Sequence, residues 1–124
     1  MSGTLDQQRA AFAWDAANAG IGRHGDDYRR VAKGAPALIM TSGLMPTLAF
    51  YASKTEAHEM LLNDVCAWFG QRFSSRSEYS PTPHDFGGVI TKLQGQSSAF
   101  YLEATDEALE ILKWIRQFVD AVPR

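Results

Sequence analysis

Apolar residues recur at three- and four-residue spacing along much of this chain, and that period predicts α-helices. The pattern is clearest in one stripe near the middle of the chain, whose opposite face is polar and includes Asp64. The stripe consists of Leu61, Leu62, Val65, Trp68 and Phe69. A broad apolar stripe backed by a polar face predicts a helix that packs one side against a core.

The first helix has a start signal and a stop signal. Thr4 and Gln7 form a capping-box pattern, in which each side chain satisfies a backbone amide of the first turn. The helix is therefore predicted over residues 5–18, with Gly20 and Gly22 ending it. The segment that follows, up to the next helix, is predicted to be a loop.

Two short helices are predicted next. Asp26 or Asp27 caps the first of them, and Gly34 closes it. Pro36 then opens another helix at the first-turn position, where its missing amide costs nothing.

The most apolar run, residues 37–56, is interrupted by Gly43 and Pro46. Gly43 suits the left-handed position after a helix end, and Pro46 suits the first turn of a new helix. The interruption predicts a corner between two helices, the second of which reaches about Ser53. Its inward residues are predicted to be Leu48, Ala49 and Ala52. Ser53 to Glu56 have a second capping-box pattern, which starts the helix of the central stripe.

The C-terminal part contains one predicted loop and two predicted helices. Residues 74–84 are rich in Ser and Pro, which is typical of an exposed, mobile loop. A short helix follows Asp85 and ends at Gly95, and Thr105 caps a last helix that Pro123 stops. Taken together, residues 1–124 are predicted to form one all-α domain, a compact bundle of about six or seven helices.

Composition narrows the class of protein only a little. The 124 residues carry a formal net charge of −2, which neither indicates nor excludes a nucleic-acid binder. The only cysteine, Cys66, has no partner for an internal disulfide, and the N-terminus lacks a signal-peptide pattern. No apolar run reaches the roughly 18 uninterrupted residues of a membrane span. We therefore expect a cytoplasmic protein.

The fragments that look catalytic are better explained in other ways. An Asp-Phe-Gly triplet lies within residues 84–88, but the chain lacks the other parts of a kinase. The three histidines lie far apart without metal-ligand spacing, and Cys66 adjoins an apolar stripe where a thiol is a packing group. Gly20 to Gly25 resemble a phosphate-binding loop only loosely. We expect no catalytic residues, no metal and no cofactor.

Aromatic and basic residues remain as candidate binding groups. The tryptophans Trp14, Trp68 and Trp114 lie in or beside apolar stripes, which favours core packing over base stacking. Four basic residues cluster within eleven positions of the sequence, and two acidic residues partly offset them. They are Arg23, Arg29, Arg30 and Lys33. This cluster predicts either a local positive patch or a solvated face with ion pairs along the helix.

Three stretches, in this order and spacing, resemble one protein family across nearly the whole chain. They are TLDQQRAAFAWDAA from Thr4, VAKGAPALIMTSGLMPTLAFYASK from Val31 and YLEATDEALEILKWIRQFV from Tyr101. The combination is similar to the small subunit of the Cmr-type (type III-B) CRISPR effector complex. Each stretch consists mostly of residues that pack helices together, so the resemblance depends on all three stretches and their order, not on any one of them.

This resemblance implies a non-catalytic helical subunit that stacks in copies along the inner side of an RNA-guided complex in antiviral defence. Its expected partners are the backbone and large subunits, further copies of itself, and the guide and target RNA. The basic positions that match are Arg9, Lys33, Lys54 and Arg116. Arg23, Arg29 and Arg30 join the candidate RNA-binding set from the positive cluster alone. The low net charge is a departure from a strongly basic RNA binder.

Two other functions fit the same sequence. A structural spacer in the same complex would use its basic residues on partner subunits and would not touch RNA. A helical adaptor would dock a peptide or a partner helix in an apolar groove.

Overall fold

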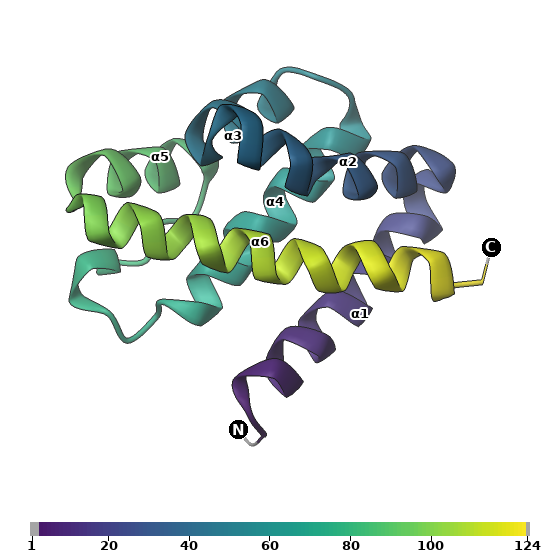
Figure 1. Cartoon of the computed structure of the whole chain (residues 1–124), viewed down its shortest axis with the longest axis horizontal. Coiled ribbons are helices and arrows are strands. Elements are labelled where there is room, and N and C mark those ends of the chain that lie inside the picture. The colour runs from purple at the N-terminus through teal and green to yellow at the C-terminus, as the bar shows by residue number, and fades with distance from the viewer. Residues whose placement is uncertain (1–2, 124) are drawn as a thin grey trace.

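The computed structural model describes residues 3–123 and confirms the all-α fold class. Within that range the chain forms six α-helices and one 3₁₀ turn, with no β-strand (Figure 1). The elements are α1 (Leu5–His24), α2 (Asp26–Ser42), α3 (Leu44–Ala52), α4 (Glu56–Arg72), η1 (Ser77–Tyr79), α5 (Phe86–Gly95) and α6 (Ser98–Ala121).

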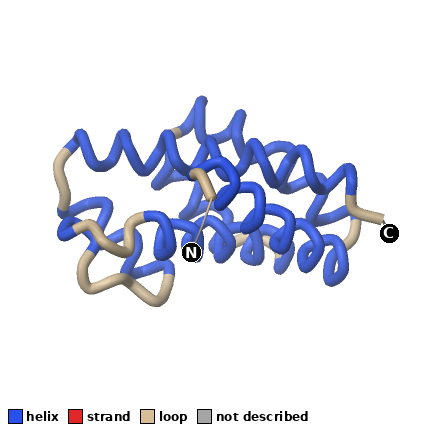
Figure 2. The backbone as a smooth tube through the Cα atoms, turned by 90° about the horizontal axis from the view of Figure 1, so that it is seen from below, coloured by secondary structure: helices blue, strands red, loops and turns tan. Residues whose placement is uncertain are grey.

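The longest helix, α6, organises the molecule. It packs most extensively against α1 and α2 and also contacts α4 and α5. In Figure 1 it runs across the front, and α1 crosses behind it at a steep angle. Figure 2 shows that the longest loop segment lies at the end of the molecule away from the C-terminus. Exposed residues recur along α6, among them Leu102, Lys113 and Asp120, so one face of the helix is open over much of its length.

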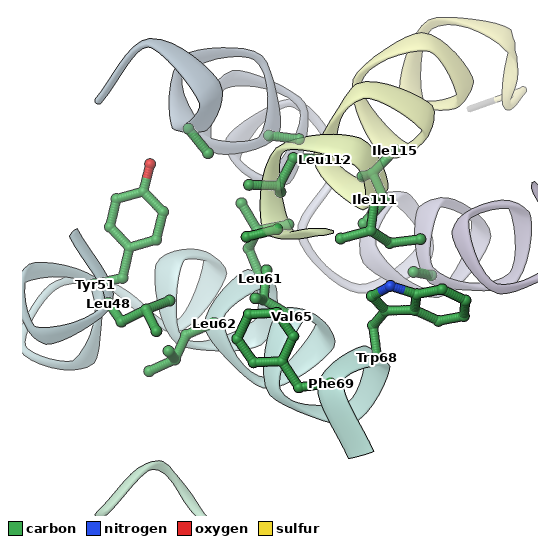
Figure 3. Packing of buried hydrophobic residues seen from close by; sticks show 14 of the residues in the cluster. Leu48, Tyr51, Leu61, Leu62, Val65, Trp68, Phe69, Ile111, Leu112 and Ile115 are labelled. Atoms are coloured by element: carbon green, nitrogen blue, oxygen red, sulfur yellow. The ribbon is translucent and has the colours of Figure 1, made fainter. Parts of the chain in front are cut away.

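The predicted central stripe is the core of the protein. All five of its residues on α4 are 2% exposed or less. Figure 3 shows Leu61 and Val65 of α4 facing Ile111 and Leu112 of α6. Asp64 departs from the predicted polar face: it is half-buried, and its Oδ2 accepts a 2.6 Å hydrogen bond from the hydroxyl of Tyr28 on α2.

The predicted end of the first helix is wrong, because α1 continues through Gly20 and Gly22 to His24. Gly20 is buried, and a Cβ built there would lie 2.4 Å from ring atoms of Tyr28. The absence of a side chain allows α1 and α2 to approach each other closely. The turn falls at Gly25 instead, whose φ of 54° lies in the left-handed region that favours glycine.

The two short helices predicted around Gly34 and Pro36 are one helix. Proline inside a helix removes one backbone hydrogen bond and costs roughly 3 kcal/mol. In α2 that loss is offset by the burial of residues on both sides of Pro36, including Ala35 and Ile39. The corner at Gly43 is confirmed: α2 ends at Ser42, Gly43 has φ of 97°, and α3 begins at Leu44.

Two details predicted for the middle of the chain are also wrong. Ala49 and Ala52 are exposed, and the buried residues of α3 are Leu44, Thr47, Leu48 and Tyr51. The cap of α4 is Thr55, which accepts from the amide of His58, whereas Ser53 ends α3.

The last helix begins seven residues before the predicted cap. Ser97 is the N-cap of α6, and its hydroxyl accepts from the amide of Phe100. Thr105 lies inside the helix, where its hydroxyl donates to the carbonyl of Tyr101. The segment at 74–84 is largely exposed, as predicted, but it is anchored to the core: Tyr79 is 1% exposed and contacts the rings of Phe73 and Phe100.

A buried carboxylate ties α1, α4 and α6 together. Glu107 of α6 is 4% exposed and accepts two 2.8 Å hydrogen bonds from Arg9 of α1. From α4, the indole N–H of Trp68 donates to it at 2.9 Å and Nε of Arg72 donates at 3.1 Å. Desolvation opposes the ionised form, but hydrogen bonds from Arg9 and Trp68 and the charges of Arg9 and Arg72 outweigh it. Together they hold the pKa of Glu107 below its ordinary value.

Replacing Glu107 by glutamine is expected to destabilise the protein strongly. The Glu107→Gln variant keeps the shape of the side chain but deprives Arg9 and Arg72 of this counter-charge. We expect a loss of roughly 2–4 kcal/mol in the free energy of unfolding, measured by urea denaturation at neutral pH. Because folding lowers the pKa of Glu107, its ionic contribution is present above pH 4.5 and is lost as pH falls through the folded-state pKa. The difference between wild type and variant is therefore expected to shrink in acid.

The matched control is Asp106→Asn, the same change at the neighbouring, exposed position. It is expected to change the free energy of unfolding by less than about 0.5 kcal/mol. Equal effects of the two substitutions would show that the buried carboxylate has no special role.

The two glycines of α1 provide a second test of the packing. Gly20→Ala is expected to cost about 1–3 kcal/mol, because the added methyl group overlaps the ring of Tyr28. Gly22→Ala is expected to stabilise the protein by roughly 0.5–1 kcal/mol, since nothing lies within 4 Å and alanine favours a helix. Thermal and urea unfolding of both variants measure these changes, and effects of the same sign would contradict the close approach of α1 and α2 at Gly20.

Candidate nucleic-acid interface

The structure separates the seven basic residues that the sequence singled out. Arg9 is a structural residue: its Nε and Nη2 bind Glu107, and its Nη1 lies 2.9 Å from Asp6. Its side chain is only 13% exposed. Because all three of these nitrogens already have carboxylate partners, the geometry argues against Arg9 as a phosphate ligand.

Arg29 is also engaged inside the fold. Its Nε and Nη2 donate to the carbonyl of Val119 at 3.1 and 3.0 Å, in the last turn of α6. The same guanidinium pairs with Asp26 and lies 3.5 Å from Asp120. A cation at this position satisfies a free carbonyl and complements the negative end of the helix dipole. Arg29 therefore joins α2 to the C-terminal end of α6.

Lys33 and Arg116 lie next to each other across the contact between α2 and α6. Nε of Arg116 donates to the backbone carbonyl of Lys33 at 3.3 Å, so the arginine side chain reaches over α2. Lys113 lies three residues before Arg116 on the same exposed face of α6. We call Lys33, Lys113 and Arg116 the basic seam.

Arg30 lies on another side of α2, where it lines shallow grooves together with Phe50 of α3 and His58 of α4. A spacing of three residues places it about 60° around the helix from Lys33. Its side chain is 72% exposed and pairs with Asp27, one turn earlier.

Carboxylates of the same chain partly neutralise the basic seam. Nζ of Lys33 lies 2.8 Å from Asp120, and Nζ of Lys113 lies 3.4 Å from Glu110. The hydrogen bond from Lys33 is the main reason that the pKa of Asp120 is lowered. Three cations thus face two anions, and the seam is only weakly positive.

Arg23 and Lys54 lie elsewhere. Arg23 lines a shallow groove with residues of α4 that include Glu56 and Glu59. Nζ of Lys54 lies 5.0 Å from the ring centroid of Phe50, after the end of α3. Arg23 is therefore next to α4 and Lys54 is next to α3, whereas the seam lies where α2 meets α6.

The sequence alone does not show which of the seven basic residues serve the fold and which are exposed. The three-residue spacing of Lys113 and Arg116, which places both on one face of a helix, is the sequence signal for the part of the seam on α6. No local pattern showed that Glu107, two residues after the expected cap, would hold Arg9. Contacts between residues this distant in sequence become visible only in the tertiary structure.

Two side chains that could take part in acid–base chemistry have shifted pKa values. Burial raises the pKa of the Cys66 thiol to about 12, which keeps it protonated at neutral pH. Desolvation and the nearby charge of Lys54 lower the pKa of His58. Among residues 3–123, no three His, Cys, Asp or Glu side chains are arranged to hold a metal ion. In the same range, no helix is both long and apolar enough to cross a membrane.

What the seam can do chemically is bind anions. Lysine and arginine side chains held side by side neutralise successive phosphates of a nucleic acid and contact them without reading the bases. Its cations come from two helices that pack against each other, which fixes their separation.

The comparisons with known proteins agree with the fold. Residues 5–122 match the model of a family described as CRISPR-associated protein (Cas_Cmr5). The chain is also similar to the X-ray crystal structure of a CRISPR-associated Cmr5 family protein from Thermus thermophilus, with a TM-score of 0.80 and 26% sequence identity. That alignment covers 99% of this chain and 100% of the other. The chain therefore belongs to the Cas_Cmr5 family of CRISPR-associated proteins.

Proposed function

We propose that this chain, as a small subunit of a type III-B Cmr complex, contacts the RNA backbone through the basic seam and so supports the capture of target RNA. Membership in the Cas_Cmr5 family supports the assignment to the complex. In the proposal, copies of the subunit stack along the inner filament beside the backbone and large subunits. The guide and the target pair with each other to read sequence, and this subunit adds contacts that do not depend on sequence.

The observation that carries the proposal is the adjacency of Lys33 and Arg116. These two positions come from segments more than 80 residues apart and meet at the 3.3 Å contact between Arg116 and the Lys33 carbonyl. Both side chains are exposed, so both are accessible to a ligand outside the fold. Lys113 adds a third exposed cation, one turn before Arg116 on α6.

The partial neutralisation of the seam limits what the subunit does alone. A phosphate that binds Lys33 competes with Asp120 for the same ammonium group. We therefore propose weak binding by the isolated subunit and a larger effect within the complex, where other subunits already hold the RNA close. Phosphate contacts by this subunit then raise the affinity of the whole assembly.

We also propose that the subunit is not catalytic. The sequence contains no set of nucleophile, base and orienting group, and the protonated, half-buried thiol of Cys66 is a poor nucleophile. RNA cleavage is then the task of other subunits.

A second function, docking of a protein partner, is favoured by one observation. A groove between α3 and α5 is lined mostly by apolar side chains, among them Met45, Pro46, Phe86 and Ile90. Such a surface suits a structural spacer or a helical adaptor that contacts proteins and not RNA. Contact with a neighbouring subunit through this groove is compatible with RNA contact through the basic seam.

Neutralising the seam is expected to weaken capture of target RNA by the assembled complex. With Lys33→Gln and Arg116→Gln combined, we expect roughly tenfold weaker binding of labelled target RNA at low salt. The slope of log affinity against log salt should become less negative by about 1.4, because two phosphate contacts are lost. Circular dichroism checks that the variant remains helical.

The matched control is the double variant Arg23→Gln with Lys54→Gln, which also removes two positive charges. We expect it to leave both affinity and salt slope nearly unchanged. Equal losses in the two double variants would mean that only total charge matters. An unchanged affinity in both, with no crosslinks from labelled target RNA to this subunit, would favour the structural spacer.

A further inference from the structure

An aromatic surface adjoins the basic seam on the outer side of α6. Phe118 lies between two tryptophans: its ring centroid is 5.3 Å from that of Trp14 on α1 and 5.9 Å from that of Trp114 on α6. The contact with Trp14 is edge-to-face, with an interplanar angle of 85°. We call Trp14, Trp114 and Phe118 the aromatic surface.

The three tryptophans of the chain differ sharply in burial. Trp68 is completely buried and its indole N–H binds Glu107, as expected of a core residue. Trp14 is 41% exposed, although the sequence pattern favours a place in the core. Core packing therefore explains Trp68, whereas the ring of Trp14 contacts Phe118 and leaves part of its surface open to a ligand.

The aromatic surface and the basic seam share one stretch of helix. A groove on α6 is lined by Trp114 together with Lys113, Arg116 and Gln117. Helical geometry places Gln117 between Lys113 and Trp114 on the exposed face. A ligand in this groove touches an aromatic ring on one side and two cations on the other.

We propose that the aromatic surface stacks an unpaired nucleobase of the RNA strand whose phosphates contact the basic seam. This inference rests on the proposed function, because it needs RNA at the seam. Sites for single-stranded nucleic acid combine a basic track for the backbone with aromatic rings for the bases, and stacking tolerates any base. The positive charge beside the rings is the reason to choose an RNA strand over an apolar protein segment as the occupant.

Stacking also compensates for the weak charge of the seam. Asp120 and Glu110 already pair with Lys33 and Lys113, so phosphate contacts alone give the isolated subunit only a weak affinity for RNA. The contribution of base–aromatic stacking depends little on salt, because it involves no release of counterions. The two kinds of contact are therefore separable by their salt dependence.

The test uses the Cmr complex assembled with wild-type subunit or with Trp14→Leu, and target RNA in which 4-thiouridine replaces uridine. Trp14→Leu keeps an apolar side chain on Phe118 and removes the stacking ring. We expect about tenfold weaker RNA binding with an unchanged salt slope. Trp14→Phe, which keeps an aromatic ring, should recover most of the affinity. Crosslinks located by mass spectrometry should fall on Trp14 or Trp114.

The outcomes distinguish this inference from the proposed function. If neutralising Lys33 and Arg116 weakens binding but Trp14→Leu does not, stacking is wrong and the backbone contact stands. If neither change affects binding and no crosslink reaches the subunit, both are wrong. If Trp14→Leu prevents the subunit from entering the complex, the aromatic surface contacts a protein and the stacking proposal is overturned. Unfolding measurements on each isolated variant check that the fold is retained.

Discussion

The position of α6 depends on the buried carboxylate of Glu107. A charge at 4% exposure is tolerated only when its hydrogen-bonding capacity is used, and here two arginines and an indole use it. The donors come from α1 and α4, so the three helices have one register in which all of these bonds form. A slip of α6 by one residue would move the carboxylate into the position of Asp106 or of Ala108 and away from these donors. The interaction therefore specifies the arrangement of the bundle as well as contributing to its stability.

The same constraint determines which cations are available at the surface. Arg9 and Arg72 bind Glu107, and Arg29 binds the last turn of α6, so these arginines serve the fold. Lys33 and Arg116 remain exposed at the contact between α2 and α6. A chain with a formal charge of −2 can thus present a local positive surface. Some of its arginines form ion pairs and hydrogen bonds within the fold, whereas Lys33 and Arg116 lie together at the surface.

The two faces of α6 differ in what they contact. Ile111, Leu112 and Ile115 pack on the core, while Lys113, Trp114 and Arg116 line the open side. Since consecutive residues of a helix point in directions about 100° apart, one short stretch supplies both sets. The core contacts hold the helix in place, so the backbone positions from which the exposed side chains project are fixed relative to one another.

The sequence by itself determined the elements whose signals are local. The α4 stripe, the capping box at Thr4 and the corner at Gly43 each depend on residues within a turn or two, and the resemblance of three stretches pointed to the family. Only the tertiary structure decided that Gly20 lies inside a helix, that Pro36 is tolerated in α2 and that Arg9 is an internal residue. It also decided which basic and aromatic residues meet on α6. In each case the partner is distant in sequence, such as Tyr28 for Gly20 or Glu107 for Arg9. Burial against such partners outweighs local propensity, which no window along the chain can show.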